Sequence, residues 1–227
     1  MTRVTWPPPL WLCADLAHPA ADSISARIEA VLGDGPATVW IRHPEALPLR
    51  RLVVWLTALQ ARCEVAGAAL WVADRLDVAA RVGAHGVHLP GGGVTAREAR
   101  RWMESVGHAG GVSVPFHAGD DPDCLLGADV ALVSPYGAVT GKGPALGTAG
   151  LAEGVRRARP AATVALGGIT RAEDVTDVLA AGAAGVAVRG LWLDHPDPAA
   201  ALRPLREALR AVATLRPGPP RANTPRP

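Results

Sequence analysis

Short apolar runs alternate with longer amphipathic segments along most of the chain. The candidate strands, most of them continuous apolar runs of the kind buried on both faces, are residues 10–14, 37–41, 69–73, 86–89, 111–114, 130–134, 163–166 and 185–188. Apolar residues between them recur at three- and four-residue spacing, as in the predicted helix 47–66. Strands that alternate with helices are typical of β/α units around a parallel sheet, and eight units favour a closed barrel. We therefore predict an α/β protein with a single (β/α)8 TIM barrel.

Two predicted helices begin with the sequence of a capping box, in which residues three positions apart hydrogen-bond to each other's backbone N–H groups. The pairs are Thr95 with Glu98 and Thr170 with Glu173. We expect the second pair to start a helix over residues 171–181, directly after the seventh strand.

The predicted barrel spans residues 10–213 as one domain, after an N-terminal extension over residues 1–9. Residues 214–227 are rich in proline and arginine, so we expect a flexible tail outside the barrel. The helical part of the fifth unit has to fit within residues 120–126, which Pro122 interrupts, and we expect a single turn or irregular structure there.

Composition and charge narrow the class of protein. The chain has 227 residues, 49% of them hydrophobic, which suits one domain with a substantial core. The 23 basic and 21 acidic residues nearly balance, which gives no reason to expect a nucleic-acid or membrane partner. Cys13, Cys63 and Cys124 lie far apart, so neither a zinc site nor a disulfide framework is expected. Without a signal-peptide core or an apolar stretch of ~18 to 20 residues, we expect a cytoplasmic protein.

Candidate chemistry lies where the predicted strands end, because barrel enzymes place their active sites at that face. The polar residues and glycines at these positions include Asp15, Arg42, His43, Asp74, Arg75, His88, Ser113, His117, Ser134, Tyr136, Thr140, Lys142, Gly167, Gly168, Arg189 and Gly190. Hydrolase, nucleotide phosphotransfer and zinc protease motifs are absent from the sequence, which leaves those chemistries without support.

Three cations and two glycine-rich turns at these strand ends favour an anionic substrate. Arg42, Lys142 and Arg189 supply the charge, and Lys142 is the only lysine in the chain. The turns at 167–168 and 190 let backbone amides approach a phosphate closely, so we predict a phosphate ester bound there, with Ser113 as a further substrate contact.

Motifs at residues 39–42, 72–75, 82–89, 111–113, 128–129, 167–170 and 180–188 resemble those of thiamine phosphate synthase and its TenI relatives, in order and at similar spacing. The resemblance covers roughly residues 10–212. It implies a small phosphorylated heterocycle, such as a thiazole phosphate, as the substrate. The habit of the family, together with the tryptophans, favours a homo-oligomer.

In the synthase, an aminopyrimidine pyrophosphate is joined to a thiazole phosphate with loss of pyrophosphate, which Mg²⁺ and basic residues stabilise. The resemblance implies that Arg42 and Lys142 are kept from this machinery and that Asp74 is a magnesium ligand. The synthase's second metal carboxylate corresponds to Gly93 and its strand 2 lysine to Pro44. These losses weaken the expected pyrophosphate site and the case for Mg²⁺ as cofactor.

One segment brings the chain closer to TenI proteins, which isomerise the thiazole instead of coupling it, while other positions depart from the synthase or from TenI. Residues 90–95 resemble the corresponding TenI segment, while Trp40 and Ala73 replace a glutamine and an asparagine of the synthase. The acid–base histidine of TenI tautomerases corresponds here to Pro135.

His88, Tyr136 and Lys142 are therefore the candidate catalytic residues, with His117 as another substitute for the missing histidine. A TenI-like or diverged member is the leading hypothesis, and an active synthase is the alternative. A non-catalytic barrel that only binds a phosphate ligand, and another phosphate-handling isomerase, stay open.

Overall fold

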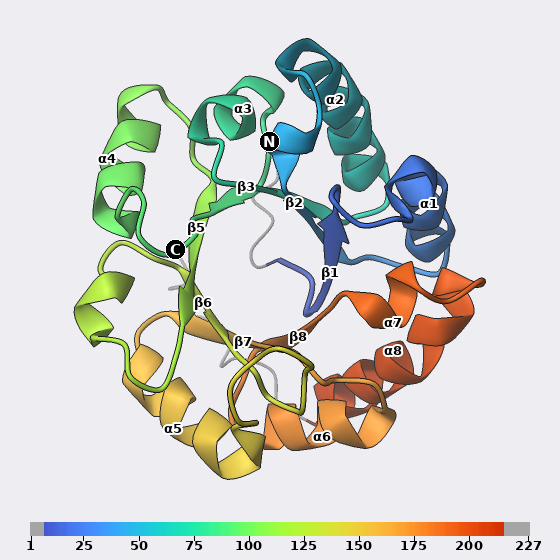
Figure 1. The fold of residues 1–227 in the computed structure, drawn as a ribbon, viewed down its shortest axis with the longest axis vertical. Helices are drawn as coiled ribbons and strands as arrows, with labels where there is room; N and C mark the ends of the chain where they lie inside the picture. Colours follow the sequence, from blue (N-terminus) through green and yellow to red (C-terminus); the bar gives the residue numbers. More distant parts are fainter. Residues whose placement is uncertain (1–6, 216–227) are drawn as a thin grey trace, which may run out of the picture.

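The computed structural model describes residues 7–215. Its parallel strands pair in chain order and close into a barrel, because β8 pairs with β1 (Figure 1). The strands are β1 (Leu10–Asp15), β2 (Thr38–Arg42), β3 (Ala69–Ala73), β4 (Gly86–His88), β5 (Gly111–Phe116), β6 (Val130–Val133), β7 (Ala162–Leu166) and β8 (Gly185–Val188). Each lies at a predicted position, which confirms the (β/α)8 fold.

Helices form a ring around the barrel (Figure 1). They are α1 (Ile24–Gly33), α2 (Leu49–Val65), α3 (Leu76–Val82), α4 (Ala96–Ser105), α5 (Gly147–Ala158), α6 (Ala172–Ala180), α7 (Gly190–Leu193) and α8 (Pro198–Leu215), with 3₁₀ turns at Ala21–Ser23, Pro44–Ala46 and Pro122–Leu125. The last of these turns confirms the irregular fifth unit. In the part of the chain that the structure describes, no helix combines the length and apolar character needed to cross a membrane.

The barrel interior is filled by large aromatic side chains in its N-terminal half. The rings of Trp11 and Trp71 lie 4.8 Å apart between centroids. Gly86 leaves room for Trp71, since a Cβ there would lie 2.6 Å from the indole. A Cβ on Gly111 would lie 2.8 Å from the same ring. Because this half is closed by packing, the space for a ligand lies at the C-terminal end.

The two predicted capping boxes have different outcomes. Thr95 and Glu98 form theirs, with N–H to side-chain distances of 2.9 and 3.2 Å. The second prediction is wrong, because the Asp174 carboxylate accepts from the N–H groups of Thr170 and Arg171 at 2.8 and 2.9 Å. Helix α6 begins at Ala172, one residue later than the box requires, so Asp174 takes the capping position.

Both predicted chain ends lie partly outside the described residues, which exclude 1–6 and 216–227. Within the extension 1–9, the carbonyl of Pro9 accepts from the N–H of Val186 at 2.9 Å. Helix α8 continues to Leu215, so Thr214 is helical rather than the start of the tail.

Candidate active site at the C-terminal end of the barrel

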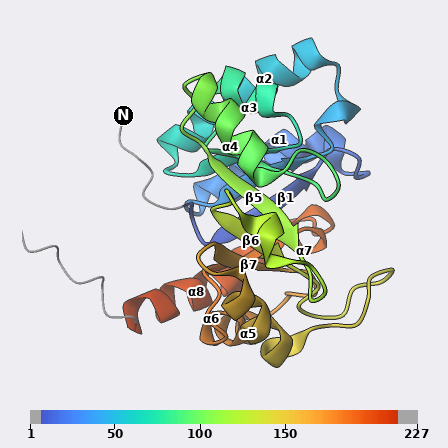
Figure 2. The same ribbon diagram turned by 90° about the vertical axis from the view of Figure 1, so that its left-hand side faces the viewer.

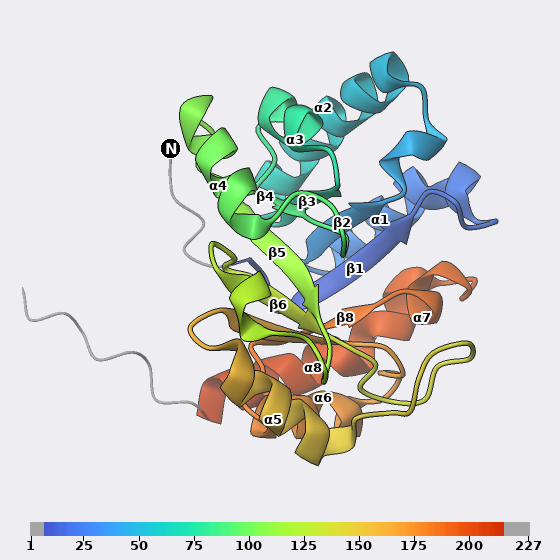
Figure 3. The ribbon, with the colours of Figure 1, turned by 60° about the vertical axis from the view of Figure 1, so that its left-hand side comes forward.

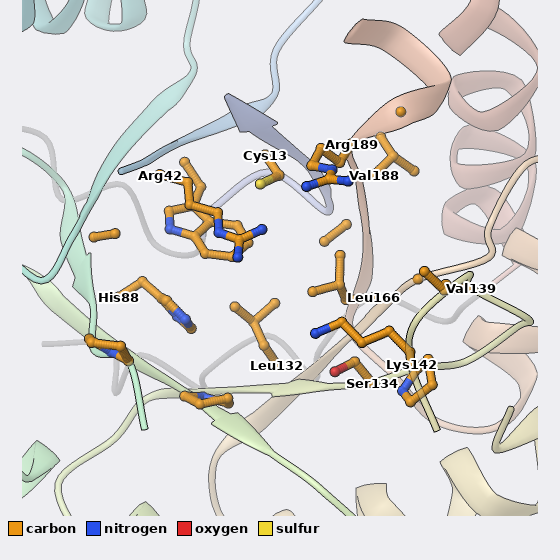
Figure 4. A pocket seen from close by; sticks show the side chains of 18 of the residues that line it. Cys13, Arg42, His88, Leu132, Ser134, Val139, Lys142, Leu166, Val188 and Arg189 are labelled. Carbon is orange, nitrogen blue, oxygen red and sulfur yellow. The ribbon is translucent and has the colours of Figure 1, made fainter. Parts of the chain in front are cut away.

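A cavity of about 890 Å³ opens where the strands end, and Figure 4 shows Arg42, His88, Lys142 and Arg189 around it. Apolar side chains form its floor, among them Trp40, Ala73, Leu132, Leu166 and Ala187. The loop 134–146, which follows β6, projects beyond the barrel on this side (Figures 2 and 3). This is the face at which TIM barrels carry their active sites.

A tightly packed glycine corner forms one wall of the cavity, after β7. Gly167 and Gly168 have φ of +93° and +70°, in the left-handed region that favours glycine. A Cβ on Gly168 would lie 2.5 Å from the backbone of Gly137, whose N–H donates to the carbonyl of Gly167 at 2.8 Å. The corner is therefore held by backbone contacts that leave no space for a side chain.

Backbone N–H groups on this wall have no acceptor among residues 7–215, among them those of Gly168, Ile169, Gly190 and Leu191. All four residues line the cavity. Gly190 and Leu191 open α7, and the first N–H groups of a helix lack partners within it. Free amides beside the half-exposed Arg189 side chain are groups of the kind that bind a phosphate. Phosphate binding by Gly167, Gly168, Arg189 and Gly190 stays a prediction.

A buried carboxylate lies beside that wall, on β1, the strand that pairs with β8. Asp15 at the end of β1 is only 3% exposed. Its Oδ2 lies 3.2 Å from Arg189 Nη1 and 3.6 Å from Arg42 Nη1. Its Oδ1 lies 2.8 Å from His43 Nδ1 and accepts the N–H of Ala17 at 3.1 Å. The two arginines predicted to bind phosphate are thus already paired with one carboxylate.

Burial raises the pKa of Asp15, but the hydrogen bonds from His43 and the Ala17 N–H, with the charges of His43 and Arg42, outweigh it. The net pKa is lowered, so the carboxyl is ionised at neutral pH. Each guanidinium keeps further N–H donors, because an arginine has five.

His88 lies buried at the edge of the cavity floor. Its Nδ1 is 3.0 Å from Ser113 Oγ, and its ring centroid is 4.5 Å from that of Trp40. Burial, followed by the charge of Arg42, lowers the pKa of His88 to about 3, so the imidazole is neutral at physiological pH. The fully buried Ser113 contacts His88 instead of lining the cavity, contrary to its expected role as a substrate contact.

Cys13 lies on the same floor without offering a nucleophile. Burial is the main cause that raises the pKa of its thiol to about 12, so the thiolate is not populated at neutral pH.

The two candidates on the loop after β6 have different positions. Tyr136 is 7% exposed and packs into the core under the loop, and it is not among the residues that line the cavity. Lys142 is exposed and lines the cavity (Figure 4). The structure therefore brings Lys142 together with Arg42, His88 and Arg189, and it leaves Tyr136 outside this group.

Asp74, the expected magnesium ligand, is exposed at the cavity rim with φ of +58°. Its carboxylate has no hydrogen-bond partner in residues 7–215, because Arg75 pairs with Asp77 at 2.7 Å instead. Within the same residues, no cluster of three or more His, Cys, Asp and Glu side chains is placed to hold a metal. Mg²⁺ requires several oxygen ligands, and this donor set does not fit a dedicated site.

Comparison with known proteins identifies the family. A family profile described as thiamine monophosphate synthase matches residues 12–190. The chain belongs to this family. It is 41% identical over 181 residues to a thiamine-phosphate synthase of Methanoculleus marisnigri, which covers 78% of this chain and 84% of the relative. A putative thiamine-phosphate synthase of Geobacter sulfurreducens is 33% identical over 211 residues, or 92% and 94% of the two chains.

A solved structure supports the fold of this family member. Thiamine phosphate pyrophosphorylase from Pyrococcus furiosus superposes with a TM-score of 0.70 and 22% identity, covering 89% of this chain and 96% of that one. The sequence motifs indicate the family, and the strand ends locate most of the polar side chains that line the cavity, but neither reveals the cluster around Asp15.

Proposed function

We propose that this member of the thiamine monophosphate synthase family binds a thiazole phosphate, or a similar phosphorylated heterocycle, and isomerises it rather than coupling it efficiently. The observation that carries the proposal is the set of free amides at Gly168, Ile169, Gly190 and Leu191 on the cavity wall. Backbone amides at a helix start bind a phosphate without metal or side-chain charge. Arg189 adds charge beside them.

The cavity floor suits the ring of such a substrate. Trp40 and His88 present neutral aromatic surfaces, and Leu132 and Leu166 add apolar area. Flat heterocycles pack favourably against aromatic rings in offset or tilted arrangements. A phosphate at the glycine corner and a ring on this floor would occupy one continuous cavity.

The side of the cavity near β2 to β4 supports isomerisation over coupling. A departing pyrophosphate would need concentrated positive charge or metal ligands there. The lining residues there include Pro44, Ala73 and Gly91, whose side chains carry neither charge nor a metal ligand. The proposed function therefore keeps the phosphate anchor and omits efficient pyrophosphate release.

An active synthase is the second candidate, favoured by the names of the relatives at 33 and 41% identity. Arg42, Asp74 and Lys142, which resemble parts of the synthase machinery, lie around the same cavity. In this reading, Mg²⁺ would be held by Asp74 together with substrate oxygens and water.

The two candidates are separated by incubating the purified protein with a thiazole phosphate tautomer alone, and with thiazole phosphate, aminopyrimidine pyrophosphate and magnesium. We expect isomerisation in the first mixture and little thiamine phosphate in the second. Robust thiamine phosphate formation would select the synthase. Thiazole phosphate binding without either reaction would select a non-catalytic barrel.

A further inference from the structure

His43 has three features that no other histidine of the cavity combines. Its Nδ1 lies 2.8 Å from the carboxylate of Asp15, which is almost fully buried. Its side chain is 37% exposed and lines the cavity next to Arg42. Its φ of +54° lies in the left-handed region, which is uncommon for a residue other than glycine. Strained backbone of this kind clusters at active sites.

The pairing with Asp15 fixes how the imidazole can act. An ionised carboxylate only accepts hydrogen bonds, so His43 Nδ1 has to carry the proton that it donates. In the neutral ring this leaves the lone pair on Nε2, which has no partner within residues 7–215. A buried carboxylate that orients a histidine also stabilises the imidazolium that forms when Nε2 takes a proton.

The remaining cavity histidines are less suited to this role. His88 is buried, with Nδ1 bonded to Ser113, so its imidazolium is strongly disfavoured. His117 pairs with Asp120 at 3.1 Å, but both side chains are more than a third exposed, at 52 and 39%. Water screens that pair, and it does not hold one geometry as firmly as a buried carboxylate does.

We propose that His43, oriented by Asp15, is the acid–base residue of this cavity. This inference rests on the proposed isomerisation and deepens it. Nε2 accepts a proton from the bound heterocycle, and the electron pair of the broken bond moves into the conjugated system. The imidazolium then returns a proton at the other end of that system. The substrate loses one proton and gains one, His43 ends neutral, and no oxidant or metal takes part.

The test compares His43→Asn with the wild type, using thiazole phosphate tautomer as the probe. Asparagine tolerates left-handed backbone and can donate to Asp15, but it cannot transfer a proton at neutral pH. We expect kcat to fall by about 100-fold or more, the usual contribution of general acid–base catalysis. Binding of thiazole phosphate, measured by titration calorimetry, should change by less than about threefold, since the free amides are untouched.

Control variants separate a chemical role from a structural one. His18 also pairs with a carboxylate, Asp194 at 3.1 Å, but does not line the cavity, so His18→Asn should keep kcat within about twofold. His43→Gly suits the same backbone conformation. Added imidazole should restore part of its activity and should not affect the wild type.

The outcomes distinguish this inference from the proposed function. An active wild type with His43→Asn equally active would overturn the role of His43 and leave the function standing. The same holds if His117→Asn causes the large loss instead. A wild type that binds thiazole phosphate but does not isomerise it would overturn both.

Discussion

The two sides of the cavity are built in different ways. Around Gly168 and Gly190, the proposed binding groups are backbone amides held by strand ends and by close contact with Gly137. On the side of β1 to β4, the polar groups are side chains, with Asp15 at the centre of the arrangement. A backbone site persists as long as the fold and its glycines persist. A side-chain site changes with single substitutions, as the resemblance to the synthase implies for Pro44 and Gly93.

This difference is the basis of the proposed function, which keeps a phosphate anchor and replaces coupling with isomerisation. The proposed anchor depends on Gly168, where an added Cβ would lie 2.5 Å from the backbone of Gly137. The proposed chemistry depends on the side chains at positions such as 43 and 44, which line the cavity.

Gly168→Ala should have the largest effect, because it would disrupt the side of the cavity that is built from backbone amides. The added Cβ would lie 2.5 Å from Gly137 at a φ of +70°. Overpacking against backbone and left-handed strain together should cost about 3 kcal/mol of unfolding free energy. Thiazole phosphate binding should be lost as well. Denaturant unfolding and titration calorimetry measure the two effects.

Gly67→Ala is the matched control. Gly67 has a φ of +62°, and a Cβ added there would meet nothing within 4 Å. The unfolding free energy of this variant should fall by only about 1 kcal/mol, the cost of left-handed backbone alone, and its affinity for thiazole phosphate should not change. Equal losses in both variants would show that the corner is not closely packed.

Measuring the unfolding free energy as a function of pH tests whether His88, on the side-chain wall of the cavity, is buried as a neutral ring. Its pKa is about 3 in the folded protein against 6.5 when exposed. A lowered folded pKa contributes stability that is fully present above pH 6.5 and is lost as pH falls from 6.5 towards 3. Between pH 7 and 4.5 the loss from His88 should be about 2 to 3 kcal/mol.

His88→Gln should lack this component, so the wild type should lose more unfolding free energy than the variant over that range. Parallel pH profiles would show that His88 is not buried as a neutral ring.

Arg189→Gln and Arg42→Gln compare the two sides directly. Both arginines pair with Asp15, so the loss of that partner is common to the two variants. Arg189 lies beside the free amides, and its loss should weaken thiazole phosphate binding about 10- to 30-fold, or about 1.5 to 2 kcal/mol. Arg42→Gln should weaken it by less than about threefold. If titration calorimetry shows a larger loss of affinity in Arg42→Gln than in Arg189→Gln, the phosphate does not bind at the glycine corner.

The fold could be predicted largely from local pattern, and the site only in part. Apolar runs located strands such as Ala69–Ala73 and Gly185–Val188 because a buried parallel strand has a distinct composition. Because barrel active sites lie at the C-terminal ends of the strands, the sequence predicts that Arg42, Lys142 and Arg189 lie together, and all three line one cavity. The sequence could not reveal the Asp15 cluster, since Arg189 is 174 residues away and meets Asp15 only when the barrel closes.

The burial of two predicted site residues could not be foreseen for a related reason. Ser113 lies beneath His88, and Tyr136 lies beneath its own loop. Whether a side chain at a strand end lines a cavity or supports its wall depends on neighbours from other strands. At α6, one residue of difference in the helix start moved the capping role to Asp174.

The central claim is that the amide anchor is kept while the pyrophosphate side is altered. Titration calorimetry of the wild type with thiazole phosphate and with pyrophosphate, each with and without magnesium, tests it most directly. The account predicts micromolar binding of thiazole phosphate, and pyrophosphate binding at least about 100-fold weaker that magnesium does not improve. Magnesium-dependent pyrophosphate binding as tight as that of thiazole phosphate would contradict it.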